Sequence, residues 1–142
     1  MNKKTSILII FIFSIAGTLF AGYLTFTKLL LGVCPLKEPC PVIFGQPACV
    51  YGLVLYLILL VSSATLLFKN IKKKSADCWP KTIFWVSFVG ILFALYSTYL
   101  EVFATHCPGG CSYSLLLPTC VYGLTMYLVI FVFSIILKKA SK

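Results

Sequence analysis

The 142-residue chain contains no arginine, one histidine and only three acidic residues. It has no Ser/His/Asp set, no phosphate-binding loop and no pair of acids, so hydrolytic and phosphoryl-transfer chemistry is excluded. Charged residues make up 11% of the chain, against roughly 25% in soluble domains. With 61% hydrophobic residues, a soluble domain of this length could not bury its apolar surface. The composition predicts one integral membrane domain over residues 1–142.

The net charge of +9 comes from twelve lysines. A basic chain can bind nucleic acid, but these lysines cluster at the ends of apolar runs. That is the pattern of topology signals and of contacts with anionic lipid headgroups. We therefore expect the lipid bilayer as a partner, and no nucleic acid.

Four apolar runs dominate the sequence, at 6–31, 42–68, 79–105 and 112–137. Each reaches the roughly 20 residues that a helix needs to cross the hydrocarbon core. Only helices and closed barrels satisfy every backbone polar group in lipid, and continuous apolar runs favour helices. The sequence therefore predicts an all-α bundle of four membrane-spanning helices.

The lysines predict the orientation of this bundle. They precede the first run, fill the connection between the second and third runs, and follow the fourth run, whereas the other two connections hold only Lys37. The positive-inside rule then places both termini and the middle connection in the cytoplasm, and the two cysteine-bearing connections outside. An alternative is a signal peptide cleaved after residues 19–21. The apolar run continues past Ala21, which favours a membrane span.

The chain contains an internal duplication. Residues 17–26 match 90–99 at an offset of 73, and Cys34-Pro35 matches Cys107-Pro108 at the same offset. Residues 47–53 match 118–124 at an offset of 71, including five consecutive identities. We assign one repeat to 6–68 and the other to 79–137. Because each repeat holds two helices, both cross in the same sense, which predicts a pseudo-twofold axis along the membrane normal.

Three matched pairs carry a physical expectation. Tyr51 and Tyr122 lie near the predicted outer interface, where an amphipathic ring is favoured. Gly52 and Gly123 lie one turn into their helices, where a missing side chain lets backbones approach. Lys28 and Glu101 occupy the same repeat position with opposite charge. Either each side chain extends to the outer headgroups, or the two form an ion pair across the axis.

Six of the seven cysteines fall on the predicted outer face, with spacings C-x5-C-x8-C and C-x3-C-x8-C. An oxidising compartment favours disulfides, and six cysteines allow fifteen complete pairings. The spacings are not those of a zinc site, so no metal is expected. The seventh, Cys78, is expected to be a reduced thiol in the cytoplasmic connection. The outer six are Cys34, Cys40, Cys49, Cys107, Cys111 and Cys120.

Two features favour reactive sulfur over simple stapling. A disulfide that closed the short segment from Cys107 to Cys111 would be strained, and strained disulfides are the labile, oxidising ones. Cys49 and Cys120 each follow a proline that marks a helix start, and a helix N-terminus favours a thiolate. Reactive sulfur at the mouth of an apolar bundle suits electron exchange with a lipid-soluble quinone.

Short segments around the outer connections match a known pattern: Gly22-Tyr-Leu-Thr25, the Cys34 and Cys40 pair, Gly45-Gln-Pro-Ala48, Gly52-Leu53, Tyr56, Tyr96-Ser-Thr-Tyr-Leu-Glu101, Cys107-Pro108 and Cys111. On these residues the chain resembles the vitamin K epoxide reductase family, including its bacterial disulfide-forming members. The resemblance implies a four-helix bundle around a quinone.

The resemblance also implies roles for individual cysteines. Cys107 and Cys111 would be the pair that faces the quinone. Cys34 and Cys40 would shuttle electrons from a separate thioredoxin-like extracytoplasmic protein. Cys49 and Cys120 have no place in the family pattern and are candidates for additional redox or structural roles.

The leading hypothesis is therefore a membrane thiol–disulfide oxidoreductase that passes electrons from an extracytoplasmic dithiol protein to a quinone. The alternative is a non-enzymatic, disulfide-stapled membrane scaffold or binding protein. A transporter is disfavoured because the fourth run carries no charge, and transport sites usually need polar groups within the membrane.

Overall fold

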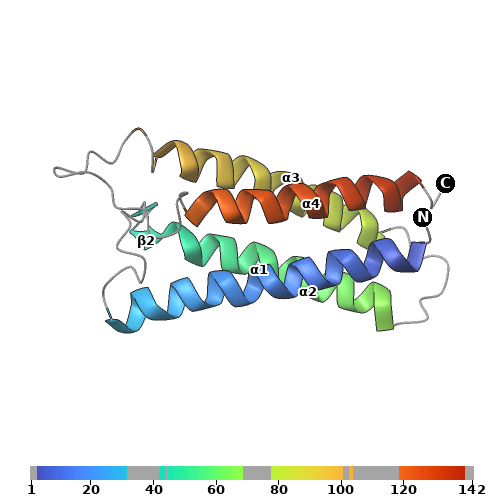
Figure 1. Ribbon diagram of the computed structural model, residues 1–142, viewed down its shortest axis with the longest axis horizontal. Helices are drawn as coiled ribbons and strands as arrows, with labels where there is room; N and C mark the ends of the chain where they lie inside the picture. The colour runs from blue at the N-terminus through green and yellow to red at the C-terminus, as the bar shows by residue number, and fades with distance from the viewer. Residues whose placement is uncertain are drawn as a thin grey trace.

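The computed structural model describes residues 3–31, 42–43, 45–68, 78–100, 103 and 119–139. In these residues the chain forms four long helices and one small hairpin (Figure 1). All four helices are long and apolar enough to cross a membrane, which confirms the predicted all-α membrane bundle. The elements are α1 (Lys3–Leu31), β1 (Val42–Ile43), β2 (Gln46–Pro47), α2 (Ala48–Phe68), α3 (Cys78–Tyr99) and α4 (Thr119–Lys139).

The second helix is shorter than the apolar run that predicted it. Val42–Ile43 and Gln46–Pro47 form the antiparallel hairpin of β1 and β2, and Gly45 lies before the second strand with a φ of 78°. This left-handed conformation is favourable for glycine. Pro47 has no N–H to donate and directly precedes the helix. Each 21-residue helix, α2 and α4, is about 30 Å long, which matches the hydrocarbon core.

Both helix starts that the prolines predicted are confirmed. Cys49 is the second residue of α2, and Cys120 is the second residue of α4. The end of the third apolar run and the start of the fourth lie mostly outside the described residues, with Leu100 and Phe103 as the exceptions.

The helices run up and down, so that both chain termini lie at one end of the bundle and the hairpin lies at the other (Figure 1). Helix α1 packs along α2, and α3 packs along α4. The two pairs also contact each other, α1 with α4 and α2 with α3. Helix α1 is continuous from Lys3 to Leu31, with Ala21 buried inside the bundle. It is therefore an integral part of the fold.

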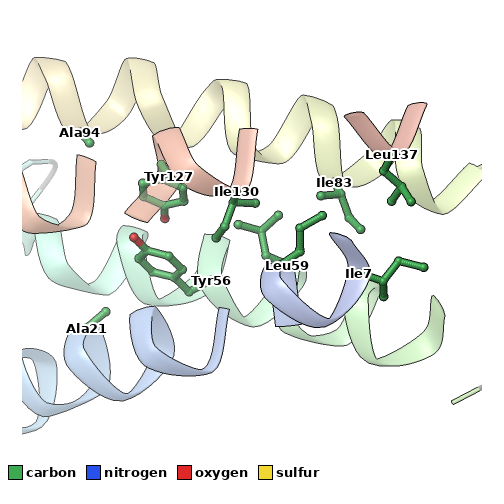
Figure 2. Close-up of a cluster of buried hydrophobic side chains, with 10 residues drawn as sticks. Ile7, Ala21, Tyr56, Leu59, Ile83, Ala94, Tyr127, Ile130 and Leu137 are labelled. Carbon is green, nitrogen blue, oxygen red and sulfur yellow. The ribbon is translucent and has the colours of Figure 1, made fainter. Parts of the chain in front are cut away.

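The same positions of the two repeats are buried in the core of the bundle. Ile10 and Ile83 are fully buried at matched positions, and so are Leu59 and Ile130. Leu59, Ile83 and Ile130 fill the part of the bundle nearer the termini (Figure 2). Large apolar side chains also cover the outer surface, as expected where lipid is the solvent.

Five of the buried serines are satisfied within their own helices. Each donates its hydroxyl hydrogen to a carbonyl three or four residues earlier, which leaves no unpaired polar atom at those positions in an apolar medium. The five bonds are Ser14 to Ile10 at 2.8 Å, Ser62 to Ile58 at 2.7 Å, Ser63 to Leu60 at 3.1 Å, Ser87 to Phe84 at 3.0 Å and Ser134 to Phe131 at 2.7 Å.

Two tyrosines join the helix pairs at the centre of the bundle. Tyr56 of α2 and Tyr127 of α4 stack with ring centroids 4.3 Å apart and planes 13° apart (Figure 2). The Tyr56 hydroxyl donates to the carbonyl of Gly123 at 2.9 Å, and the Tyr127 hydroxyl donates to the carbonyl of Gly52 at 3.2 Å. Such reciprocal contacts are what a twofold relation would produce, although the axis itself stays a prediction.

Each tyrosine ring lies against a glycine of the neighbouring helix. A Cβ atom added at Gly17 would collide with the Tyr56 ring, and one added at Gly90 would collide with the Tyr127 ring. The duplication matches Gly17 with Gly90 and Tyr56 with Tyr127. Glycine at both positions therefore lets the rings reach the centre of the bundle.

We predict that Gly17→Ala and Gly90→Ala each lower the free energy of unfolding by about 1–3 kcal/mol, because the added methyl group overpacks against a ring that cannot move without losing its partner. Gly22→Ala in the same helix as Gly17 is the control, since its Cβ would lie 3.8 Å from Leu53 Cδ1, an ordinary contact. Unfolding by sodium dodecyl sulfate in mixed micelles measures the difference. Equal stability of Gly17→Ala and Gly22→Ala would contradict the proposed packing.

Candidate functional site

An apolar pocket lies between the four helices, in the half of the bundle nearer the hairpin. It is lined by Ala48 and by six pairs of residues that the duplication matches. The pairs are Phe20 and Phe93, Ala21 and Ala94, Leu24 and Ser97, Cys49 and Cys120, Gly52 and Gly123, and Tyr56 and Tyr127.

The pocket is larger than the space that one water molecule needs. A volume of about 80 Å³ can hold the centres of water-sized molecules, several times the roughly 10–15 Å³ that one water requires. Its lining is almost entirely apolar, so it suits an apolar molecule.

The tyrosine pair and the two matched glycines form the deep end of the pocket. The Tyr56 and Tyr127 hydroxyls are held by the glycine carbonyls. A Cβ at Gly52 would meet no heavy atom within 4 Å, and one at Gly123 would lie 3.9 Å from the Tyr56 hydroxyl oxygen. The expectation that a missing side chain at Gly52 serves close backbone packing is therefore wrong. The glycines leave space in the pocket and accept hydrogen bonds from the tyrosines.

Aromatic rings form the side walls. Phe20 of α1 contacts Tyr122 of α4 with centroids 6.4 Å apart and planes at 57°. The matched pair, Phe93 of α3 and Tyr51 of α2, has centroids 5.8 Å apart and planes at 52°. Each pair joins a helix of one repeat to a helix of the other. The walls of the pocket therefore belong to the same interface that the two central tyrosines hold together.

The pocket brings together two of the six cysteines predicted to lie outside. Cys49 and Cys120 are half-buried, and both border the pocket. Within the described residues no disulfide joins them. Cys34, Cys40, Cys107 and Cys111, the pairs to which the family resemblance gives the redox roles, lie outside the described residues. So does Glu101, and with it the predicted pairing to Lys28.

Sequence reasoning assigned no site role to several residues of the pocket, among them Ser97. Its side chain is 1% exposed, and its hydroxyl oxygen has no hydrogen-bond partner. An unsatisfied buried hydroxyl costs about 1–3 kcal/mol. The matched residue in the first repeat is Leu24. The signal in the sequence that could have identified Ser97 is this replacement of an apolar residue in one repeat by a polar residue in the other.

Thr25 has the other unsatisfied buried hydroxyl among the described residues. It does not line the pocket, and its match, Thr98, donates to the Ala94 carbonyl at 2.8 Å. We assign Thr25 no role. Among the described residues, no group of three histidine, cysteine or acidic side chains is arranged to bind a metal ion.

Comparison with known proteins adds no family assignment to this geometry. No protein-family model, no curated protein and no solved structure matches the chain. The fold and the site together define a class: a four-helix membrane protein with an apolar pocket bordered by two matched cysteines. Its function is argued from that pocket.

Proposed function

We propose that the chain is a membrane thiol–disulfide oxidoreductase that passes electrons from an extracytoplasmic dithiol protein to a quinone. One observation carries the proposal: Cys49 and Cys120 border an apolar pocket inside a bundle of membrane-spanning helices. Sulfur is the redox-capable side chain in this inventory, and an apolar electron acceptor can reach such a pocket from the bilayer.

The residues of the pocket fit a quinone ring. Phe20 and Phe93 offer apolar walls, and the glycines leave open space above the tyrosine pair. Ser97 offers a hydroxyl without a partner, as a ligand that carries oxygen would need. A bound quinone would supply the acceptor for two electrons and two protons.

The proposed chemistry is a relay of thiol–disulfide exchanges. The thiolate of a partner protein attacks the Cys34–Cys40 disulfide, and the partner leaves as a disulfide after its second thiol attacks the mixed intermediate. The reduced pair in turn reduces Cys107–Cys111, and a quinone in the pocket would reoxidise that last pair. The connection that holds Cys107 and Cys111 leads directly into α4, whose second residue, Cys120, borders the pocket.

Electrons and protons balance over this relay. The two partner thiols lose two electrons and two protons as they become one disulfide. Each exchange within the chain moves one disulfide from one cysteine pair to the next and changes neither total. The same two electrons and two protons convert one quinone to one quinol, and the last cysteine pair returns to its disulfide.

We predict that the reduced, purified protein in nanodiscs, given a short-chain ubiquinone, forms one quinol for each disulfide. Quinol is measured by absorbance, and thiols are counted by the gel shift of a maleimide–polyethylene glycol. Cys107→Ser should slow the reaction about a thousandfold or more, because it removes a thiol of the pair that the quinone reoxidises. Cys78→Ser is the control, since Cys78 begins α3 at the opposite end of the bundle.

A different result would support the alternative function. If the outer cysteines keep the same oxidation state whether or not quinone and reductant are supplied, the chain is not an oxidoreductase. The disulfide-stapled scaffold or binding protein would then be the correct interpretation.

The proposal includes an orientation, with both termini in the cytoplasm and the pocket near the outer face. The lysine-rich connection between α2 and α3 supports it. We predict that a membrane-impermeant maleimide, added to reduced intact cells, labels a variant whose only cysteine is Cys120. A variant whose only cysteine is Cys78 should be labelled only after the membrane is permeabilised. Labelling in the reverse order would show that the orientation is wrong.

A further inference from the structure

The residues that line the pocket from the two repeats have the same chemical character at every matched pair of positions except one. At five of the six pairs the two residues are identical: Phe, Ala, Cys, Gly and Tyr. At the sixth, the apolar Leu24 faces the pocket from α1, and the polar Ser97 faces it from α3. The pocket therefore has a polar side and an apolar side at the same depth.

Ser97 also differs from five of the other six buried serines among the described residues. Those five donate to a carbonyl of their own helix, including Ser87, which is ten residues earlier in α3. The Ser97 hydroxyl makes no such bond. A serine in a helix has the carbonyls of the preceding turn within reach. A hydroxyl left without one, at the edge of a pocket, is available to a ligand.

The other polar groups of the pocket are already engaged or weak. The Tyr56 and Tyr127 hydroxyl hydrogens are donated to glycine carbonyls. The thiols of Cys49 and Cys120 are weak donors. Of the lining residues, Ser97 is therefore the strong donor that lacks an acceptor. The ligand that completes this site carries an acceptor oxygen on an otherwise apolar frame.

We propose that Ser97 donates a hydrogen bond to one ring carbonyl oxygen of the quinone, and that this bond selects one of the two orientations that a nearly symmetric pocket would allow. This inference rests on the proposed function, because it takes a quinone as the ligand. It adds to that function a binding residue and an orientation of the quinone. The hydrogen-bonded carbonyl lies on the α3 side of the pocket, and the apolar part of the ring packs against Leu24 on the opposite side.

The test uses two ligands of the same shape. The quinone 2,3-dimethyl-1,4-naphthoquinone has ring carbonyls, and 2,3-dimethylnaphthalene has none. The two methyl groups block the ring carbons to which a thiol would add. Binding of each compound to the detergent-solubilised full chain is measured by isothermal titration calorimetry, so the readout does not depend on turnover.

We expect Ser97→Ala to weaken binding of the quinone about three- to tenfold, the effect of one lost hydrogen bond between neutral groups. Binding of the hydrocarbon should not change. Ser87→Ala is the matched control: it removes an equally buried serine from the same helix, outside the pocket, and should affect neither ligand. Ser97→Ala should fold at least as stably as the natural chain, since it removes an unsatisfied hydroxyl.

The outcomes separate this inference from the proposed function. If Ser97→Ala leaves quinone binding unchanged, or weakens both ligands equally, Ser97 is not the donor, while a pocket that binds the quinone still supports the oxidoreductase. If the natural chain binds neither compound, the pocket is not a quinone site, and the proposed function fails together with this inference.

Discussion

The contact between Tyr56 and Tyr127 is the interaction on which the rest of the bundle depends. In lipid the hydrophobic effect does not draw helices together, so close packing and interhelical hydrogen bonds must do so. This pair supplies both, because each ring stacks on the other and each hydroxyl reaches a glycine carbonyl on the opposite helix. Gly17 and Gly90 make room for the rings. The two helix pairs are therefore joined at one level along the bundle, the layer of Tyr56 and Tyr127.

The pocket follows from the position of that layer. On the side toward the termini, apolar side chains such as Leu59 and Ile130 fill the bundle (Figure 2). On the side toward the hairpin, glycines stand where larger side chains would close the space. Because α2 and α4 begin there, their second residues, Cys49 and Cys120, border the pocket. The same geometry thus places redox-capable sulfur beside a space that is open to apolar molecules.

The hydropathy of the sequence was sufficient to predict the four helices, and the prolines were sufficient to predict where α2 and α4 begin. Neither pattern could predict that Tyr56 points inward, since a tyrosine on an apolar helix can equally face lipid headgroups. The role of Gly52 and the orphan hydroxyl of Ser97 depend on what surrounds them in space. The first strand of the hairpin was hidden in the second apolar run because Val42 and Ile43 are as apolar as the helix that follows. The roles of the four loop cysteines remain predictions.

The central claim is that a quinone enters the pocket between the two matched cysteines. A photoreactive azido-quinone, irradiated with the protein in nanodiscs and mapped by mass spectrometry, tests this most directly. The account predicts adducts on residues 48–56 of α2 and 120–127 of α4, and their loss when excess unlabelled quinone is added. Adducts confined to outward-facing residues such as Leu92 or Val132, unaffected by that competition, would contradict it.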